Sequence, residues 1–153
     1  MGKRVTTLVA TATLATMAFV GQAAAAPVHH TPSAAAKSAA ARVDSNQTRY
    51  APFTLSHNQS VSSDTARLIM QSDGNLVIYD EFNRARWASN TVGQGWEARL
   101  QTDGNFVVYT RSNRPVWASN TAGRPGSRLV VQDDGNVVVY DGSRAVWASG
   151  TNH

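Results

Sequence analysis

The sequence predicts an all-β protein in which three repeats share one hydrophobic core. A nine-residue motif occurs three times, as QSDGNLVIY from Gln71, QTDGNFVVY from Gln101 and QDDGNVVVY from Gln132. Each copy is followed by a second motif, which reads WASNT at Trp87 and Trp117 and WASGT at Trp147. No segment after Ala51 has the period of an amphipathic helix. Repeats of about thirty residues, each with several short β-rich runs, are typical of closed all-β architectures.

The first repeat shows which strands and turns we expect. Arg67–Gln71 is an apolar-rich strand, and Ser72–Asn75 contains the Asp-Gly pair that favours a hairpin turn. Asn75–Asp80 is the return strand, Glu81–Arg84 is a looser turn, and Arg86–Ser89 is a third short strand. A lone three-stranded sheet buries too little apolar surface to be stable by itself. We therefore expect three such sheets to pack around a pseudo-threefold axis.

Alternation of side chains along the return strand separates a core set from an outward set. In the first repeat, Leu76 and Ile78 face one way. Asn75, Val77 and Tyr79 face the other way. The equivalent core pairs are Phe106 with Val108 and Val137 with Val139. The core positions vary while staying apolar, whereas the outward positions are identical in all three copies.

Four tryptophans divide into two kinds. Trp87, Trp117 and Trp147 recur once per repeat, and an indole of up to about 250 Å² suits the centre of a small prism. We expect them to pack in the core, with sugar stacking as the alternative. Trp96 has no counterpart in the other repeats, so we expect it at the surface or at an interface.

Composition excludes several classes of function. The chain of 153 residues has no cysteine, which rules out disulfides, thiolate metal sites and a cysteine nucleophile. From Ala51 onward, nine arginines balance nine acidic residues, and the basic excess lies in the first fifty residues. A neutral domain is poor evidence for nucleic-acid binding, which needs a clustered basic surface.

The first fifty residues have the composition of an export signal followed by a linker. Lys3 and Arg4 precede an uncharged apolar run, and small residues allow cleavage after Ala25. Residues 1–25 are therefore predicted to be a secretory signal peptide, which would make the protein extracellular. The alternative, a membrane anchor, needs about 20 strongly apolar residues, and this run is shorter and diluted by threonine. Residues 26–50 are predicted to be a flexible linker or pro-segment, with His29 and His30 as solvated tail histidines, and residues 51–153 to be the domain.

The invariant polar set is the candidate functional site. A hairpin at Asp73 and Gly74 places Gln71 beside Asn75, which brings the polar end within about 13 Å of Tyr79. Amide, carboxylate and phenol groups at that spacing suit the adjacent hydroxyls of one hexose, with Val77 against its C–H groups. The candidate residues are Gln71, Asp73, Asn75, Val77 and Tyr79, then Gln101, Asp103, Asn105, Val107 and Tyr109, then Gln132, Asp134, Asn136, Val138 and Tyr140.

Two other interpretations of the motif remain. Asp-Gly-Asn is good hairpin chemistry by itself, although this explains neither the invariant glutamine nor the invariant tyrosine. The run Asp133–Asn136 resembles part of a calcium loop, but it lacks the acidic spacing of an EF-hand loop. We predict no metal site.

The pattern QxDxNxVxY, repeated three times and followed each time by WAS(N/G)T, resembles the bulb-type, or monocot, mannose-binding lectin family. The resemblance covers about residues 53–153. It implies a β-prism II fold with three four-stranded antiparallel sheets and pseudo-threefold symmetry. It also implies binding of terminal α-mannose on glycans without a metal ion or cofactor. Asp73 and Asn75 would hold the axial O2 hydroxyl, Gln71 would hold O3 and Tyr79 would hold O4, while Val77 would pack on the ring. The same roles fall to the equivalent residues of the other two repeats.

The sequence departs from the plant members of the family at one position. Many of them carry a cysteine between the Asp and Asn of the first motif, where this chain has Gly74, so it resembles a bacterial-style, cysteine-free member. The family also often forms homodimers by exchanging C-terminal strands. The segment that would do so here is Trp147–His153.

The main hypothesis is thus a secreted, non-enzymatic mannose-binding lectin. The first alternative is a bacteriocin or toxin that uses the mannose site for targeting. The second is a glycosidase, which would need two carboxylates across one bond, whereas each motif here supplies one carboxylate. His57 also has no evident catalytic partner. A third is a wall or matrix protein that has lost binding, against which the complete motifs argue.

Overall fold

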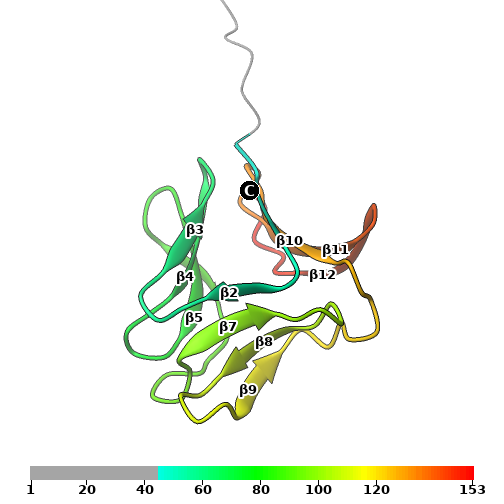
Figure 1. Cartoon of the computed structure of the whole chain (residues 1–153). Coiled ribbons are helices and arrows are strands. Elements are labelled where there is room, and N and C mark those ends of the chain that lie inside the picture. Colours follow the sequence, from blue (N-terminus) through cyan, green and yellow to red (C-terminus); the bar gives the residue numbers. More distant parts are fainter. Residues whose placement is uncertain (1–44) are drawn as a thin grey trace, which may run out of the picture. The chain divides into compact units, whose positions relative to one another are not determined.

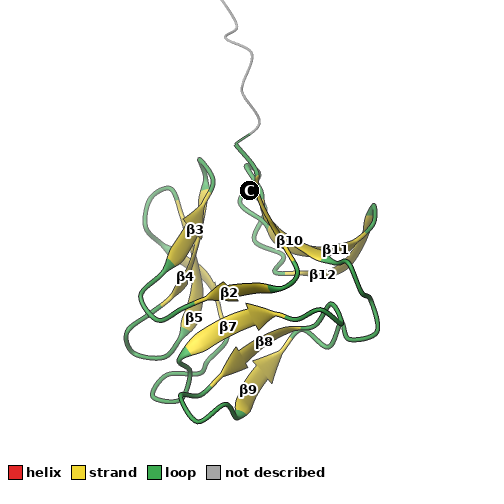
Figure 2. Cartoon of the chain, in the orientation of Figure 1, coloured by secondary structure: helices red, strands yellow, loops and turns green. Residues whose placement is uncertain are grey.

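The computed structural model describes residues 45–153, and within that range it contains twelve strands and no helix (Figure 2). The predicted signal peptide and nearly all of the predicted linker lie outside the described residues. No described segment forms a helix long and apolar enough to cross a membrane. The strands are β1 (Gln47–Tyr50), β2 (Phe53–Leu55), β3 (Ser60–Ser62), β4 (Ala66–Met70), β5 (Leu76–Asp80), β6 (Ala85–Ala88), β7 (Glu97–Leu100), β8 (Phe106–Tyr109), β9 (Pro115–Ala118), β10 (Arg128–Val131), β11 (Val137–Asp141) and β12 (Arg144–Ala148).

The strands form three four-stranded antiparallel sheets around a common interior (Figure 1). Their strand orders are β3-β4-β5-β6, β2-β7-β8-β9 and β1-β10-β11-β12, which we call the first-, second- and third-repeat sheets. All pairings between neighbouring strands are antiparallel. The predicted fold class is confirmed, because each repeat supplies three consecutive strands of one sheet.

The fourth strand of each sheet comes from the segment that precedes the repeats. Residues 47–62 contribute β1 to the third-repeat sheet, β2 to the second and β3 to the first. The domain start predicted at Ala51 is therefore too late, because Gln47–Tyr50 already lies in a sheet. The sequence QTRY carries no apolar alternation that would reveal it. β1 is an edge strand that pairs only with β10, and its side chains are half-buried or exposed.

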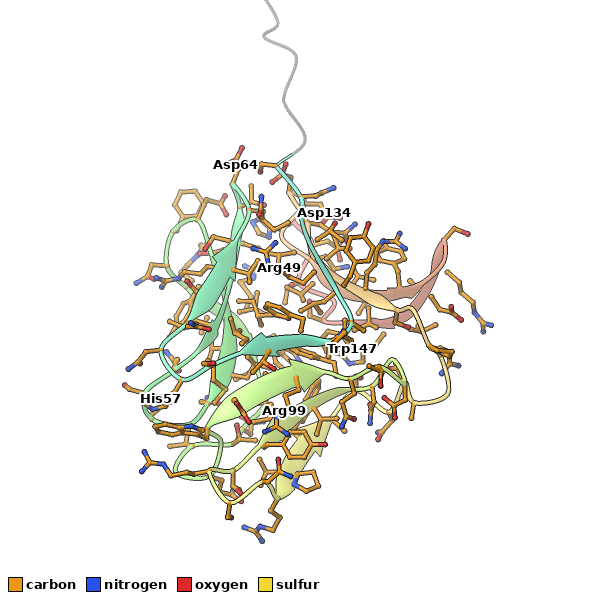
Figure 3. All side chains as sticks on the ribbon, viewed as in Figure 1. Arg49, His57, Asp64, Arg99, Asp134 and Trp147 are labelled. Carbon is orange, nitrogen blue, oxygen red and sulfur yellow. The ribbon has the colours of Figure 1, made fainter. Side chains whose placement is uncertain are left out.

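The core consists of the inward side chains of all three sheets. Leu76, Ile78 and Phe106 are at most 1% exposed, as the alternation predicted. Trp87, Trp117 and Trp147 meet edge to face, with ring centroids 5.2–5.6 Å apart, and pack against this core. Figure 3 places Trp147 between the sheets. The predicted role of the three repeated tryptophans in core packing is confirmed.

Candidate functional site

A tight turn between the first two strands of each repeat gathers the polar residues of the motif. In the first repeat, the Gln71 amide donates to the Asn75 carbonyl (2.9 Å), and the Gly74 amide donates to the Gln71 carbonyl (3.1 Å). The Asp73 carboxylate accepts the Asn75 backbone amide at 2.9 Å, and the equivalent bonds recur in the other two repeats. The hairpin predicted from the sequence thus brings Gln71 back beside Asn75.

Glycine is required at the third position of this turn. Gly74 has a φ of 88°, and a Cβ added there would lie 2.7 Å from the Gly95 carbonyl oxygen. A left-handed φ is costly for other residues, and here the next loop also occupies the space that a side chain would need.

The asparagine of the motif holds the fold as well as facing the surface. The Asn75 Oδ1 accepts hydrogen bonds from the Ser89 hydroxyl (3.2 Å) and the Thr91 backbone amide (3.1 Å). Ser89 also accepts the Leu76 amide, and the Thr91 hydroxyl donates to the Gly74 carbonyl at 2.7 Å. The WAS(N/G)T motif therefore clamps the turn of its own repeat. Sequence reasoning missed this role, although its signal was that the second motif follows each first motif at nearly the same spacing.

The one variable position of that second motif also has a backbone explanation. Asn90, Asn120 and Gly150 adopt φ values of 58°, 59° and 69°. Asparagine and glycine are the residues that most readily enter this left-handed region, which accounts for WASNT in two repeats and WASGT in the third.

The glutamine and tyrosine of each motif contact each other directly. The Gln71 side-chain amide donates to the Tyr79 hydroxyl at 2.8 Å, and the equivalent distances are 2.7 Å at Tyr109 and 3.3 Å at Tyr140. The strand register shifts immediately before each tyrosine. Such bulges bend a strand and redirect its side chains. The two ends of the predicted site are thus bridged by their own side chains.

The valine of each motif is buried rather than open to solvent. Val77, Val107 and Val138 are 3%, 2% and 2% exposed, yet none belongs to the central core cluster. They lie on the outer faces, as the alternation predicted, but they are more deeply covered than a solvent-facing valine would be. Val77 pairs with Ile69 and Ala88 of the adjacent strands, so these neighbours contribute to its cover. The valine therefore forms the floor of a patch.

An arginine lies over each site tyrosine, which sequence reasoning did not anticipate. The guanidinium carbons of Arg67, Arg99 and Arg128 are 5.2, 4.7 and 4.8 Å from the ring centroids of Tyr79, Tyr109 and Tyr140. Arg67 and Arg128 are the direct cross-strand partners of their tyrosines. Arg99 instead lies opposite Val107 and forms an ion pair with Glu97, which faces Tyr109. Figure 3 labels Arg99, which belongs to β7.

The groups of the patch that are not used in its internal hydrogen bonds include both donors and acceptors. Asp73 is exposed, while Gln71, Asn75 and Tyr79 are half-buried. The second carboxylate oxygen of Asp73 is an acceptor, the Asn75 amide NH₂ is a donor, and the Tyr79 hydroxyl can do both. No group of three or more His, Cys, Asp or Glu within residues 45–153 is arranged to hold a metal ion. At the run considered as a calcium loop, the Asp133 carboxylate accepts hydrogen bonds from the backbone amides of Ser45 and Asp64.

Solved structures of monocot lectins resemble this chain. A monomeric monocot mannose-binding lectin from Gastrodia elata is 43% identical, with a TM-score of 0.63 over 69% of this chain and 98% of that chain. The mannose-specific agglutinin from snowdrop (Galanthus nivalis) bulbs is 43% identical, with a TM-score of 0.58 over 69% and 97%. The Polygonatum cyrtonema lectin is 40% identical, with a TM-score of 0.57 over 67% and 94%. No protein-family model and no curated protein sequence matches the chain.

Three four-stranded antiparallel sheets, each with the same polar patch on its outer face, define a β-prism II protein. Together with relatives at 40–43% identity that are covered almost completely, they show that the chain belongs to the monocot, or bulb-type, mannose-binding lectin family.

Proposed function

We propose that this protein is a secreted lectin that binds terminal α-mannose at three equivalent sites, one per repeat, without a metal ion. The observation that carries the proposal is the threefold recurrence of one polar patch with the same internal hydrogen bonds. The snowdrop agglutinin was solved with methyl-α-D-mannoside and the Polygonatum cyrtonema lectin with a monomannoside, which supports mannose as the ligand here.

The groups that the fold leaves available suit a hydroxyl at the turn end of each patch. Such a hydroxyl donates to the Asp73 carboxylate and accepts from the Asn75 amide NH₂, because the Asn75 Oδ1 is already engaged by Ser89 and Thr91. The axial O2 of mannose is the group assigned there by the family resemblance. Glucose carries an equatorial O2 and would leave both partners unsatisfied, which is an effective basis for rejection.

The Gln71–Tyr79 bridge joins the turn end of the patch to the tyrosine at its other end. On binding, O3 and O4 of the sugar take hydrogen bonds from these two side chains, and the C–H groups of the ring lie over Val77. The bridge fixes both side chains before the sugar arrives, so little conformational entropy is lost on binding.

Each site is shallow, so we expect a Kd near 1 mM, which corresponds to about −4 kcal/mol. Function on a glycan-coated surface then depends on valency. Three sites on one chain raise avidity by about 10² to 10⁴ where the glycan spacing allows simultaneous binding.

Isothermal titration calorimetry with methyl α-mannoside tests the proposal. We expect saturable heat that is unchanged by EDTA and absent with methyl α-glucoside as the matched control. No heat at tens of millimolar mannoside would reject mannose binding. Loss of heat with EDTA would reject metal independence.

Secretion is tested separately by expressing the full chain in a secreting host. We expect the protein in the medium, with a mass and N-terminal sequence that start at Ala26. Retention of the full-length chain in the cell membrane would instead favour the anchor interpretation of the N-terminal segment.

A further inference from the structure

The turn that follows the site tyrosine differs in charge between the first two repeats. In the first repeat, Asp80 accepts the backbone amides of Phe82 and Arg84 and forms an ion pair with the Arg84 guanidinium at 2.8 Å. Arg86 approaches the same carboxylate at 3.8 Å. Burial raises the pKa of Asp80, but these hydrogen bonds and the Arg84 charge together lower it below its usual value. The two arginines thus share one buried carboxylate, which offsets part of their charge.

The second repeat keeps the shape of this turn and loses its carboxylate. Thr110 occupies the position of Asp80, and its hydroxyl accepts the Arg114 backbone amide at 3.1 Å. Arg111 occupies the position of Glu81. Within residues 45–153, no carboxylate lies at ion-pair distance from Arg111 or Arg114. Two exposed guanidinium groups therefore keep their full charge.

These two arginines line a shallow hollow of ≈ 470 Å³. The other lining residues are Gly93, Gln94, Thr110 and Ser112, and none of them is acidic. The Arg111 guanidinium carbon lies 3.9 Å from the centroid of the Trp96 ring, which also stacks on His57 with centroids 4.0 Å apart. In Figure 3 His57 lies at the outer edge of the domain. The stack holds Arg111 in place and explains the tryptophan that has no counterpart in the other repeats.

The hollow lies between parts of two candidate sugar sites. Gly93 donates its backbone amide to the Asp73 carbonyl at 2.6 Å, which joins the hollow to the turn of the first site. Trp96 donates to the Tyr109 carbonyl at 2.7 Å, and Thr110 follows Tyr109 directly, which joins it to the second site. The hollow therefore adjoins the backbone of both candidate sites.

We propose that this hollow is a subsite for an anionic substituent on a mannose-containing glycan: a phosphate, a sulfate or a uronate carboxylate. Guanidinium groups bind such oxyanions through paired hydrogen bonds, and Arg111 is already oriented for this by its stacking. That the glycan contains mannose rests on the proposed function. That the hollow binds an anion rests only on the charge and shape of the turn.

Glycan binding at two salt concentrations tests the subsite. Immobilised oligomannose is compared with the same glycan carrying phosphate, sulfate or uronate, at about 20 mM and about 300 mM NaCl. We expect at least one anionic form to bind about tenfold more tightly than the neutral form, which is about 1.4 kcal/mol, and the preference to shrink at high salt. Equal binding of all four glycans at low salt would overturn the inference.

Two variants and a matched control assign the preference to the hollow. Thr110→Asp places a carboxylate beside Arg114 as in the first repeat, and Arg114→Gln removes the charge itself. Because Arg111 remains in both variants, either change should weaken the preference severalfold while leaving binding of neutral oligomannose unchanged. Arg144→Gln, at the aligned position of the third repeat, removes the same charge elsewhere and should keep the preference. A preference that is undiminished in Arg114→Gln, or reduced equally in Arg144→Gln, would contradict the assignment.

Inorganic phosphate separates failure of this inference from failure of the proposed function. We expect it to shift the NMR signal of the Trp96 indole N–H in the wild-type protein and not in Arg114→Gln. If that shift appears while mannoside binding is absent, the result supports the anion site and rejects the proposal of mannose binding. If mannoside binds but neither phosphate nor any anionic glycan distinguishes Arg114→Gln from wild type, the anion subsite is rejected and the proposal of mannose binding is kept.

Discussion

The two turns that flank the second strand of each repeat contrast sharply. The turn before it, Gln-x-Asp-Gly-Asn, is the same in all three repeats and is clamped by Ser and Thr side chains from the following motif. The turn after it differs in every repeat. It holds an Asp80–Arg84 ion pair in the first, an uncharged Thr110 beside a cationic Arg114 in the second, and a shorter turn with Gly142 in the third.

The contrast shows that invariance within this chain has two separate causes. Glycine, the asparagine Oδ1 and the Ser/Thr pair are required by packing and hydrogen bonding of the turn. The side chains of Gln71 and Tyr79 belong neither to the core nor to the clamp of the turn, so their recurrence points to a ligand. Asp73 serves the turn through one carboxylate oxygen and leaves the other available. The second turn supplies none of the residues assigned to mannose, and its charge has diverged between repeats.

The largest effect should come from filling the space beside the glycine of the first turn. A Cβ in Gly104→Ala would collide with the Arg124 carbonyl oxygen at a φ of 87°. We expect the free energy of unfolding, measured by urea denaturation, to fall by about 3 kcal/mol from strain and overpacking together.

Gly123→Ala is the matched control for that change. Gly123 has nearly the same φ, 85°, but no atom lies within 4 Å of its added Cβ. It should therefore show only the conformational penalty of about 1–2 kcal/mol. Equal losses in the two variants would mean that the close approach between loops does not constrain the turn.

A smaller loss of stability is expected when the serine of the second motif, which holds the first turn, is removed. Ser119→Ala removes the acceptor for the Phe106 amide (3.0 Å) and a donor to Asn105. Leaving these groups unsatisfied should lower the free energy of unfolding by about 1–3 kcal/mol. Ser112→Ala, at an exposed turn, should change it by less than about 0.5 kcal/mol. If denaturation curves of the two variants coincide, the clamp has no measurable role.

Much of the fold and of the candidate site could be predicted from the sequence, because both follow from local patterns. Neighbouring residues are enough to predict the hairpins at the Asp-Gly pairs and the two faces of the strand that contains Leu76 and Val77. The recurrence of one tryptophan per repeat likewise predicts a shared core. β1 could not be predicted, because Gln47–Tyr50 is an edge strand whose partner β10 lies about eighty residues away. The Arg67–Tyr79 stacking and the depth of Val77 depend on cross-strand register, which sequence spacing alone does not fix.

The smallest predicted effect concerns the link between the C-terminal residue and the second turn of the first repeat. The Thr151 carbonyl and the Glu81 carboxylate raise the pKa of His153 above its usual 6.5, and the His153 hydrogen bond lowers the pKa of Glu81 below 4.5. The histidine contribution to stability is complete below pH 6.5 and disappears as the pH rises through the raised pKa. The glutamate contribution is complete above pH 4.5 and disappears as the pH falls through the lowered pKa.

The stability difference between wild type and Glu81→Gln should therefore be greatest between about pH 4.5 and pH 6.5. Urea midpoints measured from pH 3 to pH 9 give this difference directly. The Nε2 of His153 lies 2.9 Å from the Glu81 carboxylate, and both side chains are partly exposed, so the effect should be small. A difference that is constant over this range would show that the ion pair does not form in solution.

Binding of one mannose at each outer patch is tested by an NMR titration of the side-chain amides. Methyl α-mannoside should shift the NH₂ signals of Asn75, Asn105 and Asn136 with saturation. Asn105→Asp keeps the acceptor Oδ1 used by Thr121 and replaces the donor NH₂ by a carboxylate oxygen, so it should abolish the response of the second patch alone in a folded protein. Saturable shifts at three patches in the wild type and at two in the variant are the predicted result. Mannoside shifts elsewhere on the domain, with all three asparagine signals unmoved, would contradict the account.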